Sequence, residues 1–215
     1  KIVFTGTPVK IKKKEYSQQE KETILHKEGL NVDKPIVLAF GGSQGAKKIN
    51  DAIVEIIKNK LNENYQMIWA VGPKQYDGIK EELKKFNIDI ENLEGIKALP
   101  YIYNMEELMN SVDVIVARSG AMTITEISNL GKPSILIPLP NVSHNHQLYN
   151  AKVLENVDAA KIILNDELTG TKLSEAIKEI VVTQNRMKKM GENALKVSTS
   201  NVEDKIYSEI KKLVK

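Results

Sequence analysis

Short apolar runs alternate with longer amphipathic stretches along most of this sequence. The runs are short enough for strands buried on both faces of a sheet, and the stretches between them have the apolar spacing of surface helices. Strands and helices alternate about six times, which predicts an α/β fold with a doubly wound parallel sheet and right-handed crossovers. The expected strands are Pro35–Phe40, Tyr65–Val71, Glu94–Leu99, Val112–Ala117, Ser134–Pro138 and Ala160–Leu164.

Turn and cap signals set the expected helices. Ser17-Gln-Gln-Glu20 fits a capping box, and Gly29 follows that helix as its C-terminal stop. Ile2–Phe4 is a further strand-like run near the start of the sequence. The last helices have no strands after them, so they either cap the sheet or extend toward another domain. The remaining expected helices are about Lys47–Asn62, Pro73–Phe86, Asn104–Asn110, Met122–Leu130, Thr171–Val182, Gln184–Val197 and Asn201–Val214.

Composition narrows the class of protein. The chain has 215 residues, of which 41% are hydrophobic and 27% charged, as in an ordinary globular domain with a sizeable core. The net charge of +3 is too small to indicate nucleic-acid binding, and the absence of cysteine excludes disulfides and thiolate metal sites. No apolar run approaches the roughly 18–20 residues of a membrane span. We expect one domain over residues 1–215, cut from a longer protein because the sequence begins at Lys1.

The stretch Ala117–Ala151 organises the rest of the chain. A strand ends at Ala117, Ser119-Gly120-Ala121 turns the backbone, and a helix begins near Met122. Such a turn leaves N–H groups at the positive end of the helix dipole, which is a seat for phosphate. After the next strand, a polar segment carries His144, His146, Gln147 and Asn150 to the same edge. Open α/β sheets bind ligands at that edge.

Gly41–Ala46 is a second candidate phosphate loop. It is neither a Walker A sequence, because Ala46 and Lys48 break the pattern, nor the dinucleotide fingerprint G-x-G-x-x-G. Alone it fits a tight strand-to-helix turn equally well. Two such loops in one sheet favour a ligand with a diphosphate.

Several side chains fit both a structural and a functional interpretation. Thr123–Glu126 matches a capping box, but the Glu126 carboxylate also suits a ribose diol. Arg118 can pair with an acid or a phosphate. Gln147 and Asn150 share a helical face and suit either sugar hydroxyls or solvent. Tyr101–Met105 can wall a flat base or simply pack as a loop.

Other features have plainer interpretations. Trp69 lies in an apolar strand and is expected in the core. Lys10–Lys14 is a basic run that suits a solvated linker, with contact to anionic lipid or phosphate as the alternative. His144 and His146 have no acid or cysteine nearby, so they make a poor metal site, and we expect no metal and no other cofactor.

Four motifs follow one another along the chain: GGSQGA at Gly41–Ala46, RSGAMTITE at Arg118–Glu126, GKPSILIPLP at Gly131–Pro140 and HQLYNA at His146–Ala151. These motifs closely resemble those of the MurG family of UDP-N-acetylglucosamine transferases, glycosyltransferase family 28. The resemblance spans nearly the whole chain and corresponds to the C-terminal, donor-binding half of that family. TGTPVK at Thr5–Lys10 resembles the family's inter-domain TGNPVR, with threonine in place of the usual asparagine and lysine in place of the usual arginine.

The resemblance implies a GT-B enzyme with two Rossmann-like domains, of which this chain is the C-terminal one. It implies that Glu126 binds the ribose hydroxyls of UDP and that Ile102 and Met105 contact uracil. His146, Gln147 and Asn150 would read the GlcNAc hydroxyls. The diphosphate would lie between the Ser43-Gln44 loop and the turn of Ser119, Gly120, Ala121, Met122 and Thr123. Arg118 and Lys10 complete the candidate substrate-binding residues.

The implied reaction moves GlcNAc from UDP-GlcNAc to lipid I with inversion, which makes lipid II for peptidoglycan. The general base, the acceptor groove and the surface that meets the anionic membrane are expected in an N-terminal domain absent from this chain. The resemblance therefore implies a peripheral enzyme on the cytoplasmic face of the bacterial membrane. The fragment itself is expected to be soluble, to bind donor and to turn over little.

Three alternatives remain open at the level of sequence. The first is a related family member with another sugar or lipid acceptor. The second is the donor-binding subunit of a split lipid-linked GlcNAc transferase. The third is a UDP-GlcNAc 2-epimerase-like enzyme, which should carry a cluster of acids and histidines near the anomeric carbon.

Overall fold

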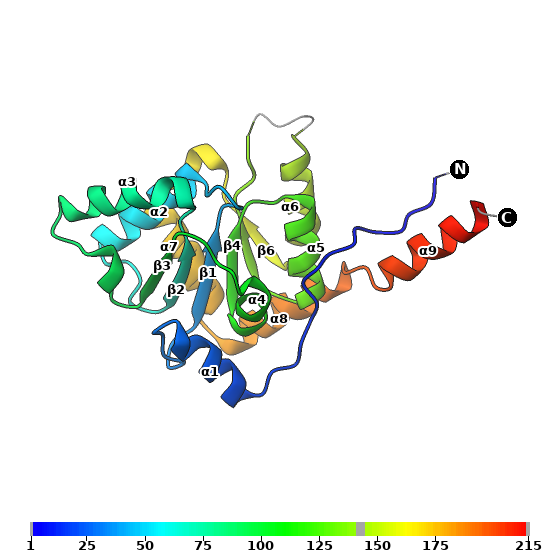
Figure 1. Cartoon of the computed structure of the whole chain (residues 1–215), viewed down its shortest axis with the longest axis horizontal. Helices are drawn as coiled ribbons and strands as arrows, with labels where there is room; N and C mark the ends of the chain where they lie inside the picture. The colour runs from blue at the N-terminus through cyan, green and yellow to red at the C-terminus, as the bar shows by residue number, and fades with distance from the viewer. Residues whose placement is uncertain (1, 141–144, 214–215) are drawn as a thin grey trace.

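A wholly parallel six-stranded sheet forms the centre of the molecule (Figure 1). The computed structural model describes residues 2–140 and 145–213, so His144 lies outside the described residues. The strand order is β3-β2-β1-β4-β5-β6. The strands are β1 Ile36–Phe40, β2 Gln66–Ala70, β3 Ile96–Leu99, β4 Val114–Ala117, β5 Ser134–Leu136 and β6 Ala160–Ile162.

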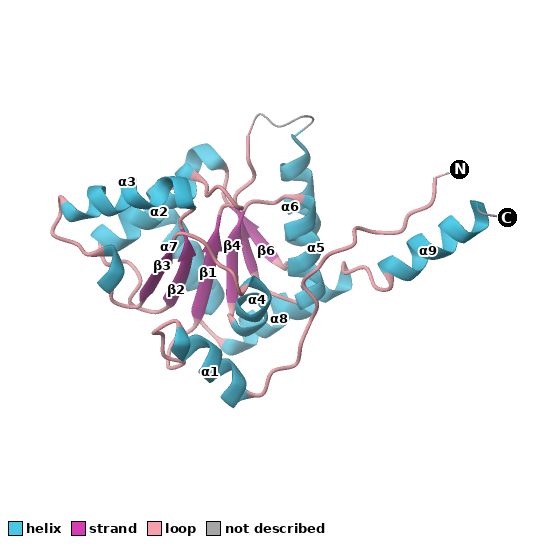
Figure 2. Cartoon of the chain, in the orientation of Figure 1, coloured by secondary structure: helices cyan, strands magenta, loops and turns pink. Residues whose placement is uncertain are grey.

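Helices cover both faces of the sheet (Figure 2). One hydrophobic cluster joins α2, α3 and α7 to one face, and a second cluster joins α1, α4, α5 and α6 to the other. The helices are α1 Gln18–Lys27, α2 Lys47–Lys58, α3 Pro73–Lys84, α4 Met105–Ser111, α5 Ala121–Leu130, α6 His146–Glu155, α7 Gly170–Val181, α8 Gln184–Lys196 and α9 Val202–Leu213, with short 3-10 turns η1 Ile90–Asn92 and η3 Asn165–Glu167.

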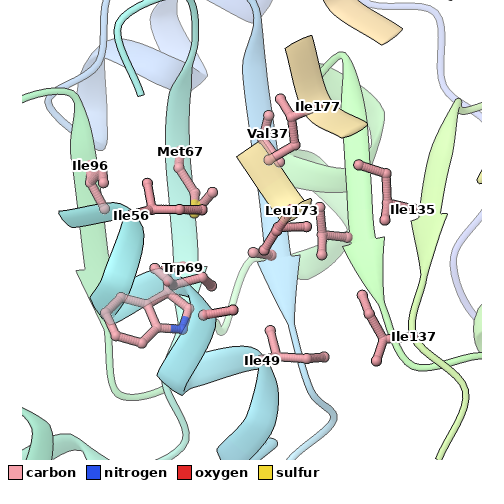
Figure 3. Packing of buried hydrophobic residues seen from close by; sticks show 14 of the residues in the cluster. Val37, Ile49, Ile56, Met67, Trp69, Ile96, Ile135, Ile137, Leu173 and Ile177 are labelled. Carbon is pink, nitrogen blue, oxygen red and sulfur yellow. The ribbon is translucent and has the colours of Figure 1, made fainter. Parts of the chain in front are cut away.

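Alternating strand side chains supply the two clusters, as expected for a sheet buried on both sides. Val37, Met67 and Trp69 face the α2 and α7 side, where Ile49 and Leu173 pack against them (Figure 3). Their neighbours in sequence, such as Leu38 and Ile68, belong to the opposite cluster. Every residue of β1, β2, β4 and β5 is buried, which explains why these strands are mostly apolar apart from Gln66 and Ser134.

The predicted doubly wound sheet is confirmed, and each of the six strands lies where an apolar run predicts one. The strands are shorter than the predicted runs, because flanking residues such as Pro35 and Val71 lie outside them. The Ser17–Glu20 capping box is also confirmed: the Ser17 hydroxyl accepts from the Glu20 N–H, and the Glu20 carboxylate accepts from the Ser17 N–H at 2.8 Å. Of the last helices, α7 and α8 cap the sheet, as their buried residues Leu173 and Met190 show.

One expected strand is wrong. Ile2–Phe4 pairs with no described strand, and Ile2 is 101% and Phe4 85% exposed. This segment and α9 extend together away from the sheet (Figure 1). Gly6 lies against the side chains of Thr199 and Val202, which joins the two segments near the domain. Within the described ranges, no helix is both long enough and apolar enough to cross a bilayer.

Candidate functional site

The order of the strands creates a crevice at the centre of the sheet. The chain leaves β1 toward β2 on one side and leaves β4 toward β5 on the other, although β1 and β4 are hydrogen-bonded neighbours. The connections after β1 and β4 therefore diverge, and the crevice between them is where doubly wound sheets bind ligands. Both predicted phosphate loops, Gly41–Ala46 and the turn at Ser119-Gly120-Ala121, follow these two strands. In the structure the first loop spans Gly41–Gly45, between β1 and the N-cap residue Ala46 of α2.

The Gly41–Gly45 loop needs glycine at defined positions. Gly42 and Gly45 have φ values of 88° and 75°, in the left-handed region that favours glycine, and the Gly45 N–H donates to Gly42 O at 3.0 Å. A Cβ on Gly41 would lie 2.3 Å from the Cβ of Ala46. Ser43 and Gln44 are exposed at the tip of the loop, so their backbone is accessible to a ligand.

The helices that follow the two loops begin without a side-chain cap. Ala46 precedes α2 and Gly120 precedes α5, and neither has a side chain that can accept a hydrogen bond. The first N–H groups of an α-helix have no partner within the helix, and the helix dipole makes this end positive. Two such ends beside one crevice provide donors for an anion with two charged groups.

The α5 turn is fixed from α6 by hydrogen bonds that local sequence does not show. Ser119 is fully buried, and its hydroxyl donates to Gln147 O at 2.8 Å. Asn150 Nδ2 donates to Ser119 O at 3.1 Å, and Gln147 Oε1 accepts from the Leu139 N–H at 3.0 Å. Both predicted sugar-reading amides are therefore at the crevice. Each also bonds to the protein itself, and sugar recognition stays a prediction.

Glu126 lies where three stretches of sequence meet. A cavity of about 230 Å³ is lined by Glu126 of α5, by Gly42 and Ser43 of the first loop, and by side chains that follow β3. Those side chains are the predicted base-contacting residues Ile102 and Met105, together with Pro100, Tyr101 and Met109. The structure thus brings together an acid, a glycine loop and an apolar wall that lie far apart in the sequence.

Burial raises the pKa of Glu126 above its ordinary value. The half-buried carboxylate has no ion-pair partner among the described residues. A half-buried, unpaired carboxylate facing a cavity is expected at a binding site, where a ligand's donors replace the lost water.

The capping-box interpretation of Thr123–Glu126 is wrong. Helix α5 already begins at Ala121, because Gly120 takes the extended conformation of an N-cap with φ −62° and ψ 150°. Thr123 is therefore inside the first turn rather than before it. Ala121 and Met122 are exposed there, and Gly120 and Thr123 are partly exposed. The N–H groups of this first turn face the edge at which the diphosphate is predicted.

Arg118 has a structural role that was not expected. Its guanidinium Nη1 donates to Ile137 O at 3.0 Å and to Pro138 O at 3.3 Å, where the chain leaves β5. No acidic side chain in the described part of the chain forms an ion pair with it, so the predicted ion pair is not found. Its contact with phosphate stays a prediction. Lys10 is exposed and precedes Ile11, which lines the Glu126 cavity.

A series of buried, hydrogen-bonded polar side chains beside the first loop was not predicted from the sequence. Trp69 is in the core, as predicted, but its indole N–H donates to Asn50 Oδ1 at 2.9 Å. Asn50 in turn bonds to Gln75, whose Nε2 donates to Gln44 O at 3.2 Å in the loop. The sequence did contain a signal for these bonds, because the polar residue Asn50 interrupts the apolar face of α2.

A larger hollow of about 410 Å³ lies at the opposite, amino edge of the strands, and it contains none of the predicted site residues. Lys132 lines it, and burial lowers the pKa of this lysine to about 8. Its ammonium group donates to Asn110 O and Val112 O at 2.8 and 2.6 Å, at the C-terminal end of α4. These carbonyl contacts give Lys132 a structural role. Residues 2–140 and 145–213 contain no cluster of acids and histidines able to hold a metal ion.

Comparisons with known proteins agree with this geometry. Residues 36–206 match the model of the glycosyltransferase family 28 C-terminal domain. The chain is 40% identical over 213 residues to a Thermoanaerobacter sp. protein named UDP-N-acetylglucosamine--N-acetylmuramyl-(pentapeptide) pyrophosphoryl-undecaprenol N-acetylglucosamine transferase. It is also 40% identical over 219 residues to the protein of that name from Acetivibrio thermocellus. These alignments cover 99% and 100% of the chain but 57% and 56% of the relatives, so the chain spans little more than half their length.

Solved structures show the same relationship. The crystal structure of MurG from Acinetobacter baumannii matches with a TM-score of 0.72 and 28% identity, over 87% of this chain and 52% of that one. A UDP-GlcNAc 2-epimerase from Neisseria meningitidis, solved bound to UDP-GlcNAc, matches with a TM-score of 0.57 over 91% of this chain and 48% of that one. The epimerase is only 14% identical, so this second match shows a shared fold alone.

Proposed function

The chain belongs to the family of the glycosyltransferase family 28 C-terminal domain, and we propose that it is the donor-binding part of an enzyme that uses UDP-N-acetylglucosamine. The observation that carries the proposal is the cavity that joins Glu126 to Ser43 and to Ile102. A nucleoside needs a flat apolar wall for its base and acceptors for its ribose hydroxyls. Ile102 with Met105 supplies the first, and the Glu126 carboxylate supplies the second.

The diphosphate is proposed to lie between the starts of α2 and α5. The loop at Ser43 and Gln44 meets it from one side, and the Gly120–Thr123 turn meets it from the other. When the sugar is transferred, negative charge grows on the departing UDP. Fixed N–H groups and helix dipoles stabilise that charge, since they are already oriented toward it.

The sugar and the acceptor complete the proposal. Gln147 and Asn150 lie at the same crevice and are proposed to contact the GlcNAc hydroxyls, together with His146 at the start of α6. The relatives' name gives an N-acetylmuramyl-(pentapeptide) pyrophosphoryl-undecaprenol as acceptor. We propose the same lipid-linked acceptor, and hence action at the cytoplasmic face of the bacterial membrane. The general base for the acceptor hydroxyl is proposed to belong to another part of the enzyme, so that the chain alone holds donor without turnover.

Calorimetric titration of the chain with UDP, UDP-GlcNAc and UDP-GalNAc tests donor binding. Glu126→Gln should weaken UDP and UDP-GlcNAc by about tenfold or more, because hydrogen bonds to a charged acceptor are each worth about 1.5–3 kcal/mol. Glu175→Gln on the exposed side of α7 removes the same charge away from the crevice and should leave both affinities unchanged. A folded chain that binds no uridine nucleotide contradicts the proposal.

A further inference from the structure

A polar side chain interrupts the apolar face of α2 directly behind the first glycine loop. Asn50 is 1% exposed and lies next to Ile49 in the core. Its Oδ1 accepts the indole N–H of Trp69 at 2.9 Å. Its Nδ2 donates to Val71 O at 2.8 Å and to Gln75 Oε1 at 3.0 Å. Every one of these bonds is protected from water or nearly so, which makes their geometry costly to change.

Gln75 carries this chain of bonds to the ligand edge. It lies in the first turn of α3, and its Nε2 donates to Gln44 O at 3.2 Å. A continuous path of side-chain amides thus joins Trp69, inside the sheet, to an exposed residue at the tip of the Gly41–Gly45 loop.

The two ends of the path fix its direction. An indole N–H only donates, so Asn50 must turn its oxygen toward Trp69 and its nitrogen toward Gln75. Gln75 must then turn its nitrogen toward Gln44 O, which only accepts. Neither amide can flip without placing two acceptors or two donors face to face. The path therefore specifies one position for the Gln44 carbonyl.

Steric contacts hold the same loop from the side. A Cβ on Gly45 would lie 2.2 Å from Val71 O and 2.9 Å from Gln75 Nε2. A Cβ on Gly72 would lie 2.6 Å from Gln44 O. The loop and the turn after β2 touch through backbone, and Gln75 bridges them at the point of contact.

We propose that Gln75 is a positioning residue that sets the conformation of the Gly41–Gly45 loop for the ligand's diphosphate. Gln75 is itself oriented by the buried, hydrogen-bonded pair Trp69 and Asn50. The inference rests on the proposed function, in which this loop holds the diphosphate of a uridine nucleotide. Gln75 itself touches no reacting atom. It acts by holding the Gln44 carbonyl, and with it the neighbouring N–H groups, in the arrangement that binds the anion.

Two variants of Gln75 distinguish its bond with Asn50 from its bond with Gln44 O. Gln75→Met keeps the length of the side chain and removes both bonds without adding charge. Gln75→Glu keeps an acceptor for Asn50 Nδ2 but places an acceptor against Gln44 O, so it breaks the loop bond alone. Gln19→Met, on the exposed surface of α1, is the matched control.

Amide hydrogen exchange of the ligand-free chain measures positioning directly. The Gly45 N–H is bonded within the loop, so both Gln75 variants should speed its exchange by about fivefold, the worth of about one hydrogen bond. UDP affinity, measured by calorimetry, should fall by about the same factor. UDP should also change the emission of Trp69, the single tryptophan in the sequence, and Gln75→Met should abolish this change at saturating UDP.

The outcomes distinguish the inference from the proposed function. Wild-type exchange at Gly45, wild-type UDP affinity or an unaltered Trp69 response in folded Gln75→Met would each overturn the positioning role. If the unmodified chain binds no UDP while Gln75→Met still exchanges faster at Gly45, the proposed function fails and the structural part of the inference stands.

Discussion

The first N–H groups of α7 have side-chain acceptors within the protein, whereas those of α2 and α5 have no side-chain cap. At α7, the Thr169 hydroxyl accepts from the Lys172 N–H, and the Glu55 carboxylate accepts from the Gly170 N–H at 2.7 Å and the Thr171 N–H at 3.3 Å. Helices α1 and α8 also have side-chain caps, from Ser17 and Thr183. Helices α2 and α5 have none, because Ala46 and Gly120 stand in the N-cap positions.

We propose that this difference separates a helix start completed within the fold from helix starts that bind a ligand. At α7 the protein supplies its own anion, and that helix start is complete within the fold. Helices α3, α4 and α6 also begin without a side-chain cap, so an uncapped start alone does not mark a ligand site. At α2 and α5, whose starts border the crevice, the proposed diphosphate would take the corresponding position. An uncapped start forgoes about 1 kcal/mol of stability, and in the proposed function the forgone contacts add to the free energy of binding.

The largest expected effect is steric and concerns Gly45. Gly45→Ala forces a Cβ against Val71 O at a left-handed φ, so the free energy of unfolding should fall by about 3 kcal/mol, as urea denaturation would measure. Gly29 also has a left-handed φ, of 77°, but a Cβ there meets nothing within 4 Å. Gly29→Ala should therefore cost only about 1 kcal/mol. Equal losses would show that Gly45 is not held by close contact.

The second-largest expected effect concerns the Glu55 carboxylate, which accepts hydrogen bonds at the start of α7. Glu55→Ala should lower the free energy of unfolding by about 2 kcal/mol, because two N–H groups at the helix start lose their acceptor. Glu55→Gln keeps an oxygen acceptor without the charge and should lose about half as much. UDP affinity should be unchanged in both variants. A fall in affinity would remove the distinction between the two kinds of helix start.

The reverse change adds a cap to α5. Gly120 already has the dihedral angles of an N-cap, and a Cβ there meets nothing within 4 Å, so Gly120→Ser should fold normally. Its hydroxyl should compete with the ligand for the first-turn N–H groups and weaken UDP by about tenfold, or about 1.4 kcal/mol. Gly120→Ala adds the Cβ without the oxygen and is the control in the same calorimetric titration. Equal affinities of the two variants would contradict a phosphate seat at α5.

The smallest expected effect is a pH dependence that reports Glu126. Since burial raises its pKa, its proton is taken up at a higher pH than that of an exposed glutamate. UDP affinity should fall as the pH is lowered through this raised pKa, because the carboxylate is lost as an acceptor. Glu126→Gln should flatten this dependence, and an unchanged slope in that variant would exclude Glu126 as its source.

The same shift has the opposite sign for folding. In the window between the ordinary and the raised pKa, folded Glu126 binds its proton more tightly than unfolded Glu126. Stability should therefore rise as the pH falls through this window, while UDP affinity declines. Thermal unfolding of the wild type and of Glu126→Gln over the same pH range measures this difference.

The sequence was sufficient to predict the sheet because four of its strands, β1, β2, β4 and β5, are buried on both faces, and glycine turns follow several strands. Gly41–Gly45 was recognisable because only glycine suits its dihedral angles. Ile2–Phe4 was mispredicted since an apolar run forms a strand only beside a partner strand. Thr123–Glu126 was mispredicted because the extended Gly120 starts the helix at Ala121, which places Thr123 inside the first turn.

Long-range contacts account for what the sequence did not reveal. The carbonyl partners of Arg118 lie at Ile137 and Pro138, and the hydroxyl of Ser119 bonds to α6. No local pattern contains these pairings. The cavity at Glu126 likewise depends on the register that brings β1, β3 and β4 into one sheet. The sequence named Ser43, Ile102, Met105 and Glu126 each from its own stretch, but it did not name other lining residues such as Met109.

The reversal of strand order at β1 and β4 also has a kinetic consequence. Each half of the sheet is built by consecutive strands, whereas the seam between the halves pairs Val37 with Val114, far along the chain. Closing so long a loop costs more chain entropy than adding the next strand in sequence, so this pairing is expected to form more slowly. The crevice therefore does not exist in either half alone, and the proposed donor site would form in the same step that joins the halves.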